Sequence, residues 1–200
     1  MKSLVTGVAS LALGVLCACR ESAHGSRAAS SSPAAANDSA FSVAKALQRF
    51  RADIGEAANR LDGPASRDAL VRHFVRALNA GDVAALRDLM LSRAEFAYLY
   101  YPESPQSRPP YGLEPQLMWL QISARSDRGL SRALRAFAGG RLRYLSYACE
   151  AEPGRAGAVR LYNACVISHQ ENGATITEPL FGSIVERDGR YKFVGYANRL

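Results

Sequence analysis

Hydrophobic residues recur with helical spacing through the first half of the domain that begins near residue 41. The period of about 3.6 residues predicts three amphipathic helices, over 41–61, 67–78 and 83–91. Ser66 is suited to cap the second helix and Asp82 to cap the third. Gly81 stands between these two helices, where a left-handed C-terminal cap is needed. So short a joint predicts a sharp turn between them.

The pattern changes to a period of two in the sequence EFAYLYY, residues 95–101. Phe96, Tyr98 and Tyr100 then fall on one face and the intervening residues on the other, which predicts a strand. Further along, the sequence predicts a proline-rich loop over 102–112 and helical segments over 113–120 and 130–137.

The last third of the chain alternates between apolar and polar residues. It predicts four strands, over 141–150, 158–170, 174–186 and 190–198. Asn172-Gly173 and Asp188-Gly189 separate strands, and these pairs favour hairpin turns that need positive φ. Helices followed by an antiparallel meander indicate an α+β fold. We expect residues 41–200 to form a single domain.

The first residues of the chain have the composition of an export signal. Lys2 precedes an uncharged apolar run over 4–16. That run has the length of a signal-peptide core and is shorter than the ~20 residues of a membrane-spanning helix. Residues 1–18 are therefore interpreted as a signal peptide and left out of the fold.

The sequence Leu16-Cys17-Ala18-Cys19 resembles the bacterial lipobox. The resemblance implies cleavage before Cys19 and lipidation of that cysteine. The alternative is an ordinary secretory signal with a chance cysteine nearby. Metal binding by the two cysteines is disfavoured, because no His or Cys cluster follows at zinc-like spacing.

Residues 19–40, rich in Ala and Ser, are expected to form a flexible tether between the lipidated cysteine and the domain. The expected product is a membrane-anchored lipoprotein that faces the periplasm or the cell exterior. Arg20 follows the anchor, in place of the aspartate that retains some lipoproteins in the inner membrane. This weakly favours the outer membrane.

The net charge of +7 does not predict a nucleic-acid partner. Arginines carry almost all of it, with lysines only at positions 2, 45 and 192, and they are scattered among acidic residues. The sequence also contains no phosphate-cradling glycine loop, no GxSxG and no HExxH. It therefore predicts neither a cofactor nor a metal site.

Cys149 and Cys165 lie on consecutive predicted strands. A hairpin centred near Gly157 would bring them opposite each other. In an oxidising envelope this predicts a disulfide that stabilises the fold by about 3 kcal/mol. Two buried free thiols are the alternative.

Two segments resemble the nuclear transport factor 2-like superfamily, which includes ketosteroid isomerases and polyketide-cyclase-like proteins. ALVRHFVRALNAGDVAALRDLM, residues 69–90, is similar to the family's opening helices, and LFGSIVERDGRYKFVGY, residues 180–196, to its closing hairpin. The resemblance covers roughly residues 66–200. It implies a cystatin-like cone, in which a strongly curved antiparallel sheet wraps around the helices. It also implies a pocket between sheet and helices, and often a homodimer through the sheet.

Family enzymes of the isomerase type pair a carboxylate base with an oxyanion-stabilising tyrosine or acid. Glu95 is nearest to the corresponding junction, and Tyr98 or Tyr100 could act as donor. The position of Glu95 nevertheless predicts a solvated residue at a strand start. His169 is a further acid–base candidate, although its place near a strand end favours a solvated side chain.

These observations lead to two functional hypotheses. The first is a non-catalytic envelope lipoprotein that binds a small apolar ligand or an envelope protein. The alternative is a lipid-tethered isomerase, cyclase or hydrolase that uses Glu95 with a pocket tyrosine. The absence of a complete acid–base set favours the first. Four aromatic residues are expected to line the core or the pocket: Phe96, Tyr98, Tyr100 and Trp119.

Overall fold

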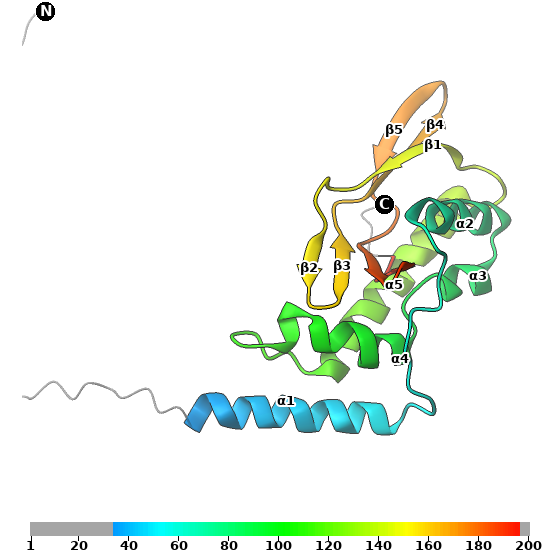
Figure 1. Cartoon of the computed structure of the whole chain (residues 1–200). Helices are drawn as coiled ribbons and strands as arrows, with labels where there is room; N and C mark the ends of the chain where they lie inside the picture. Colours follow the sequence, from blue (N-terminus) through cyan, green and yellow to red (C-terminus); the bar gives the residue numbers. More distant parts are fainter. Residues whose placement is uncertain (1–33, 197–200) are drawn as a thin grey trace, which may run out of the picture. The chain divides into compact units, whose positions relative to one another are not determined.

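The computed structural model describes residues 34–196, with side chains from residue 43 onward. Its helices are α1 (Ala34–Ala52), α2 (Arg67–Ala80), α3 (Val83–Asp88), α4 (Arg93–Glu95) and α5 (Pro115–Phe137). Short π and 3-10 segments follow α4: η1 (Phe96–Tyr100), η2 (Tyr101–Glu103) and η3 (Pro105–Ser107). The strands are β1 (Arg143–Ala148), β2 (Gly154–Ala156), β3 (Val159–Tyr162), β4 (Val166–Glu171), β5 (Ala174–Glu178), β6 (Ile184–Arg187) and β7 (Arg190–Phe193) (Figure 1).

The caps predicted for the second and third helices are confirmed. The Ser66 side chain accepts a hydrogen bond from the Ala69 amide at 3.1 Å. Gly81 ends α2 with a φ of 70°, in the left-handed region that glycine adopts without strain. Asp82 then caps α3 by accepting from the Ala85 amide at 3.0 Å.

The first predicted helix is displaced along the sequence. Helix α1 starts at Ala34 and ends at Ala52, so it includes residues 34–40 that the sequence assigned to the tether. The chain beyond it is irregular rather than helical to residue 61. Farther along it lies against β7, where the Tyr191 amide donates to the Pro64 carbonyl at 3.0 Å.

The strand predicted over 95–101 is wrong, because the chain there is helical. Ser92 and Glu95 form a capping box, in which each side chain accepts from the backbone amide of the other. The π-helical turn η1 continues directly from α4. The two helical segments predicted farther along are one helix, α5, in which Gly129 is buried.

The strands form two antiparallel sheets, one in the order β1-β4-β5 and one in the order β2-β3-β6-β7. The predicted hairpin turns are present, with positive φ at Asn172, Gly173, Asp188 and Gly189. Gly157, at 57°, turns the chain between β2 and β3. Helices together with antiparallel sheets confirm the α+β class in a single domain. Neither sheet is closed into the strongly curved cone that the family resemblance implied.

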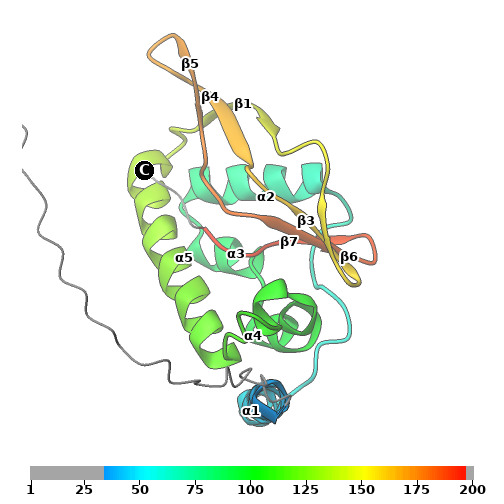
Figure 2. The same ribbon diagram turned by 90° about the vertical axis from the view of Figure 1, so that its left-hand side faces the viewer.

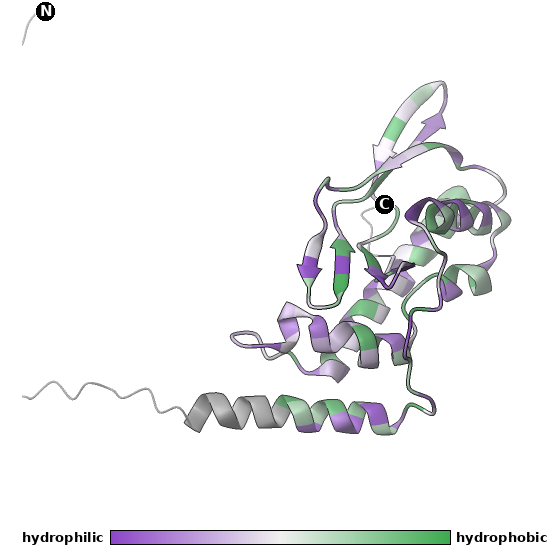
Figure 3. Ribbon diagram, in the orientation of Figure 1, coloured by the Kyte–Doolittle hydropathy of each residue, from purple (hydrophilic) through white to green (hydrophobic). Residues whose placement is uncertain are grey.

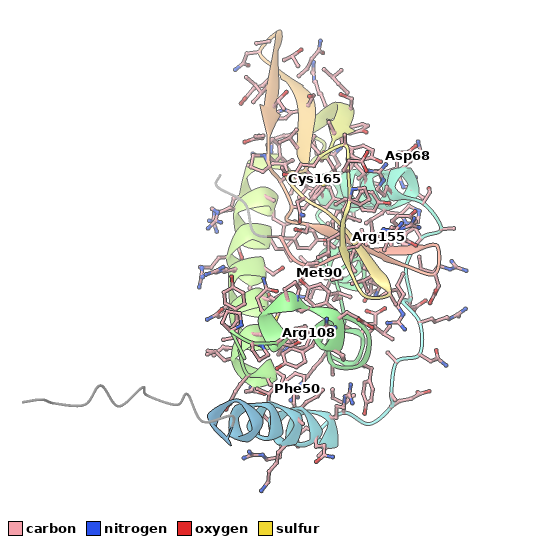
Figure 4. The ribbon with its side chains drawn as sticks, turned by 60° about the vertical axis from the view of Figure 1, so that its left-hand side comes forward. Phe50, Asp68, Met90, Arg108, Arg155 and Cys165 are labelled. Carbon is pink, nitrogen blue, oxygen red and sulfur yellow. A yellow bond between two sulfur atoms is a disulfide. The ribbon has the colours of Figure 1, made fainter. Side chains whose placement is uncertain are left out.

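The four-stranded sheet is covered on both faces. Ile184 and Phe193 belong to a hydrophobic cluster with Phe74 of α2. Val185 belongs to a second cluster, which includes Phe50 of α1. Hydropathy alternates along β3 (Figure 3), where Val159 and Leu161 lie with the second cluster and Arg160, on the opposite face, pairs with Glu186. In Figure 4, Cys165 marks the first cluster and Phe50 the second. One face of this sheet therefore packs in the cluster that includes α2, and the other face in the cluster that includes α1.

Candidate functional site

Glu95 is the sequence-predicted catalytic carboxylate, and the structure buries it. Only 3% of the residue is exposed, which corrects the expectation of a solvated strand start. The reason is the capping box, because it turns the side chain back over the start of α4. The Ser92 amide donates to Glu95 Oε2 at 2.7 Å. The Asp62 amide donates to Oε1 at 2.6 Å.

Lys192 of β7 completes the surroundings of this carboxylate. Its Nζ lies 3.2 Å from Glu95 Oε2, and the residue is 5% exposed. Lys192 pairs with Val185 across the β6–β7 ladder, so it extends from the sheet face that carries the second hydrophobic cluster. The ammonium compensates a charge that would otherwise be buried without a counter-ion.

An irregular segment over 61–64 closes one side of the pair. A Cβ on Gly63 would lie 2.1 Å from the Tyr191 carbonyl oxygen and 2.9 Å from Lys192 Cγ. Only glycine permits so close an approach between this segment and β7. Leu61 is buried in the second hydrophobic cluster and anchors the segment.

A hollow of about 610 Å³ opens beside the ion pair. Glu95 and Lys192 contribute to its lining, together with the charged side chains of Glu56, Arg60, Asp62, Arg87 and Asp88. Acidic and basic groups are mixed there, so the hollow suits a polar ligand better than an apolar one. Both oxygens of Glu95 already accept hydrogen bonds, which leaves the carboxylate poorly placed to take a proton from a bound molecule.

The tyrosines proposed as partners of Glu95 make other contacts. The Arg51 guanidinium stacks on the Tyr98 ring at 4.4 Å. Tyr100 is buried beside Phe96, and burial raises the pKa of its hydroxyl. The hydrogen bonds found for Glu95 among the described residues do not join it to either tyrosine.

The four residues expected to line the core or a pocket gather in the second hydrophobic cluster. Phe96 lies at its centre, with ring centroids 6.1 Å from Tyr100 and 5.2 Å from Trp119. Tyr98 and Trp119 are only partly buried and pack against the cluster. The hollow beside Glu95 and Lys192 is lined by other residues.

His169 is buried, contrary to the expectation of a solvated side chain. It is 1% exposed, and its ring meets Phe137 of α5 edge-on, because the three-stranded sheet packs against the end of that helix. Its Nε2 lies 2.8 Å from Glu178 Oε1. Its Nδ1 has no hydrogen-bond partner within residues 34–196. A separate hollow of about 420 Å³, also lined by Arg141 and Arg143, lies beside it.

The structure does not bring the two predicted acid–base groups together. Glu95 lies beside the four-stranded sheet and His169 in the three-stranded sheet, and the hollows beside them share no lining residue. Sequence reasoning missed Lys192, which looks like any polar position of an alternating strand. The sequence did carry a signal for the placement of Glu95. Ser92-Arg93-Ala94-Glu95 is a capping-box sequence, which predicts a helix start with the Glu95 side chain folded back on it.

The structure joins Cys149 and Cys165 by a disulfide, with their Cα atoms 4.0 Å apart. The bridge lies just beyond the Ala148–Val166 pair that ends the β1–β4 ladder. Cys19, the predicted lipidation site, lies outside the described residues. Within residues 34–196, no helix is long and apolar enough to cross a membrane, and no group of His, Cys, Asp and Glu could hold a metal ion.

Comparisons with protein-family models, with curated proteins and with solved structures found no match to this chain.

Proposed function

We propose that this protein is an exported, lipid-anchored envelope lipoprotein whose domain binds a ligand or a partner without catalysing a reaction. A variant of the nuclear transport factor 2-like fold remains our proposal for its ancestry, on the strength of the two sequence segments. The observation that carries the non-catalytic assignment is the environment of Glu95. Three donors, from Asp62, Ser92 and Lys192, occupy the carboxylate that the enzymatic alternative requires as a base.

Export is supported by the disulfide. Bridges of this kind form and persist in oxidising compartments and are rare in the bacterial cytosol. The leader, the lipobox-like sequence and a Cys149–Cys165 bridge are therefore mutually consistent.

The chemistry of the hollows refines the proposed ligand. The hollow beside Glu95 and Lys192 is lined mainly by charged and polar groups. A small polar molecule or a charged segment of a protein fits such a lining better than the small apolar ligand of the first functional hypothesis.

Metabolic labelling with a radioactive fatty acid, followed by membrane fractionation, tests the proposal. The unaltered protein is expected to carry label and to sediment with membranes, whereas Cys19→Ala should lose both. Cys17→Ala is the matched control and should retain both, since that residue leaves with the signal peptide. A Cys19→Ala protein that stays labelled and membrane-bound would refute lipid anchorage. Native mass spectrometry of the purified domain would then reveal a co-purified ligand or a homodimer.

A further inference from the structure

The outward face of α5 is apolar in its first two turns and mainly basic farther along. Leu117 and Leu120, in its first two turns, are exposed, Leu120 by 58%. Arg125, Arg128 and Arg135 are exposed farther along the helix. The opposite face is buried through Met118, Ser126, Gly129, Leu130, Ala133 and Phe137. Figure 2 shows α5 along one side of the domain, where no other described element covers its outward face.

A further exposed aromatic residue lies near the apolar end of α5. Tyr111 is 70% exposed. Its neighbour Gly112 lies against α1, because a Cβ there would be 3.9 Å from Val43 Cγ2. The start of α5 also lies next to α1 (Figure 2). The apolar side chains therefore gather at the end of the domain from which α1 leads back toward the N-terminus.

The charge on this face is predominantly positive. Among the exposed residues of α5, the charged ones are Arg125, Asp127, Arg128 and Arg135. Apolar side chains at one end and arginines along the rest are typical of helices that lie in the interface of an anionic bilayer. Each basic residue near such a surface contributes about 1 kcal/mol of attraction.

We propose that the outer face of α5, together with Tyr111, lies on the surface of an anionic phospholipid bilayer. Leu117, Leu120 and Tyr111 enter the headgroup region, and the arginines contact lipid phosphates. This inference rests on the proposed lipid anchorage. Because α1 starts at Ala34, only residues 20–33 separate it from Cys19. Fourteen residues reach at most about 50 Å in any conformation, so the anchor would keep this end of the domain within that distance of the membrane.

Vesicle binding by the unlipidated chain from Arg20 onward tests the surface separately from the anchor. The chain is expected to sediment with phosphatidylcholine vesicles that contain phosphatidylglycerol, more weakly with phosphatidylcholine alone, and less as salt is raised. Trp119, the single tryptophan, packs against Phe96 on the inner side of α5 and does not face the proposed surface. In L120W a second tryptophan stands on that surface, and we expect phospholipids brominated on their acyl chains to quench its fluorescence beyond any quenching in the unaltered chain.

Paired substitutions identify the residues responsible. The double variant L117S/L120S is expected to reduce vesicle affinity about tenfold or more, because two apolar side chains no longer leave water. R125E/R128E should abolish the preference for anionic vesicles. The matched control is R143E/L145S, which makes the same kinds of change at exposed positions of β1 and should bind like the unaltered chain.

Three results would overturn the proposal. They are no binding to either vesicle, binding that survives both α5 variants, and an equal loss in the β1 control. Any of them would leave the α5 face to solvent or to a protein partner. None would bear on lipid anchorage, which Cys19→Ala tests in cells. Conversely, a protein without lipid could still bind vesicles through α5.

Discussion

Each of the two sheets of this domain carries an ionisable pair with at least one buried member, and the pairs differ in how fully their polar atoms are satisfied. Beside the four-stranded sheet, Glu95 and Lys192 are both buried, and backbone amides donate to each carboxylate oxygen. In the three-stranded sheet, His169 is buried but Glu178 is partly exposed. One ring nitrogen of that histidine has no partner within residues 34–196.

In the first pair, both carboxylate oxygens accept hydrogen bonds, so its burial is structural. The second pair leaves one ring nitrogen without a partner within residues 34–196. Buried charge is tolerated when hydrogen bonds and a counter-ion replace water, and removal of one member then leaves several groups unpaired. The Glu95–Lys192 pair therefore connects the irregular segment, α4 and β7. The His169–Glu178 pair connects only neighbouring strands, and water can still reach its carboxylate.

The largest expected effect comes from Glu95→Ala. It leaves the Lys192 ammonium without its counter-ion and removes the acceptor of the Asp62 and Ser92 amides. We expect the free energy of unfolding to fall by about 4 kcal/mol, within the range for a broken buried pair. Urea unfolding followed by circular dichroism measures it.

Glu56→Ala is the control for this substitution. Glu56 lines the same hollow but is exposed, so its removal should change the unfolding free energy by no more than about 0.5 kcal/mol. Equal losses from the two variants would mean that Glu95 is no more structural than a surface carboxylate, and would restore it as a candidate base.

The disulfide should have the next largest effect, and its effect should be confined to one region. C149A/C165A removes a bridge at the end of the β1–β4 ladder and is expected to cost about 3 kcal/mol. Hydrogen exchange should quicken in β1 and β4, with smaller changes around Glu95. Two titratable thiols in the unfolded, unreduced mature protein, which is expected to lack Cys17 and to carry lipid on Cys19, would contradict the bridge itself.

Local signals in the sequence were sufficient for much of the fold but not for the candidate site. The caps at Ser66 and Asp82 and the turns near residues 172 and 188 depend on neighbouring residues only, and the structure confirms them. The alternation in residues 95–101 was misread, because the capping box at Ser92 outweighs side-chain periodicity there. Helical start signals can therefore decide a segment whose aromatic residues alone favour a strand.

The site depended on contacts between residues far apart in the sequence. Lys192 meets Glu95 because the residues just before α4 pair with β7. The Leu91 amide donates to the Phe193 carbonyl, and the Phe193 amide to the Leu89 carbonyl, both at 2.9 Å. No local pattern encodes that pairing. His169 is buried for a similar reason, since Phe137 belongs to a helix more than thirty residues earlier in the chain. Composition and period could identify these residue types without showing what would surround them.

The smallest effects are expected at the second pair, where the two partners should respond differently. Glu178→Ala leaves His169 with two buried nitrogens lacking partners, and should lower the unfolding free energy by about 2 kcal/mol. His169→Leu removes the unpaired nitrogen and keeps an apolar contact with Phe137, while water can hydrate Glu178. We therefore expect a change below about 1 kcal/mol, measured by urea unfolding at neutral pH. If His169→Leu lowers the unfolding free energy more than Glu178→Ala does, His169 makes a stabilising contact with something outside residues 34–196.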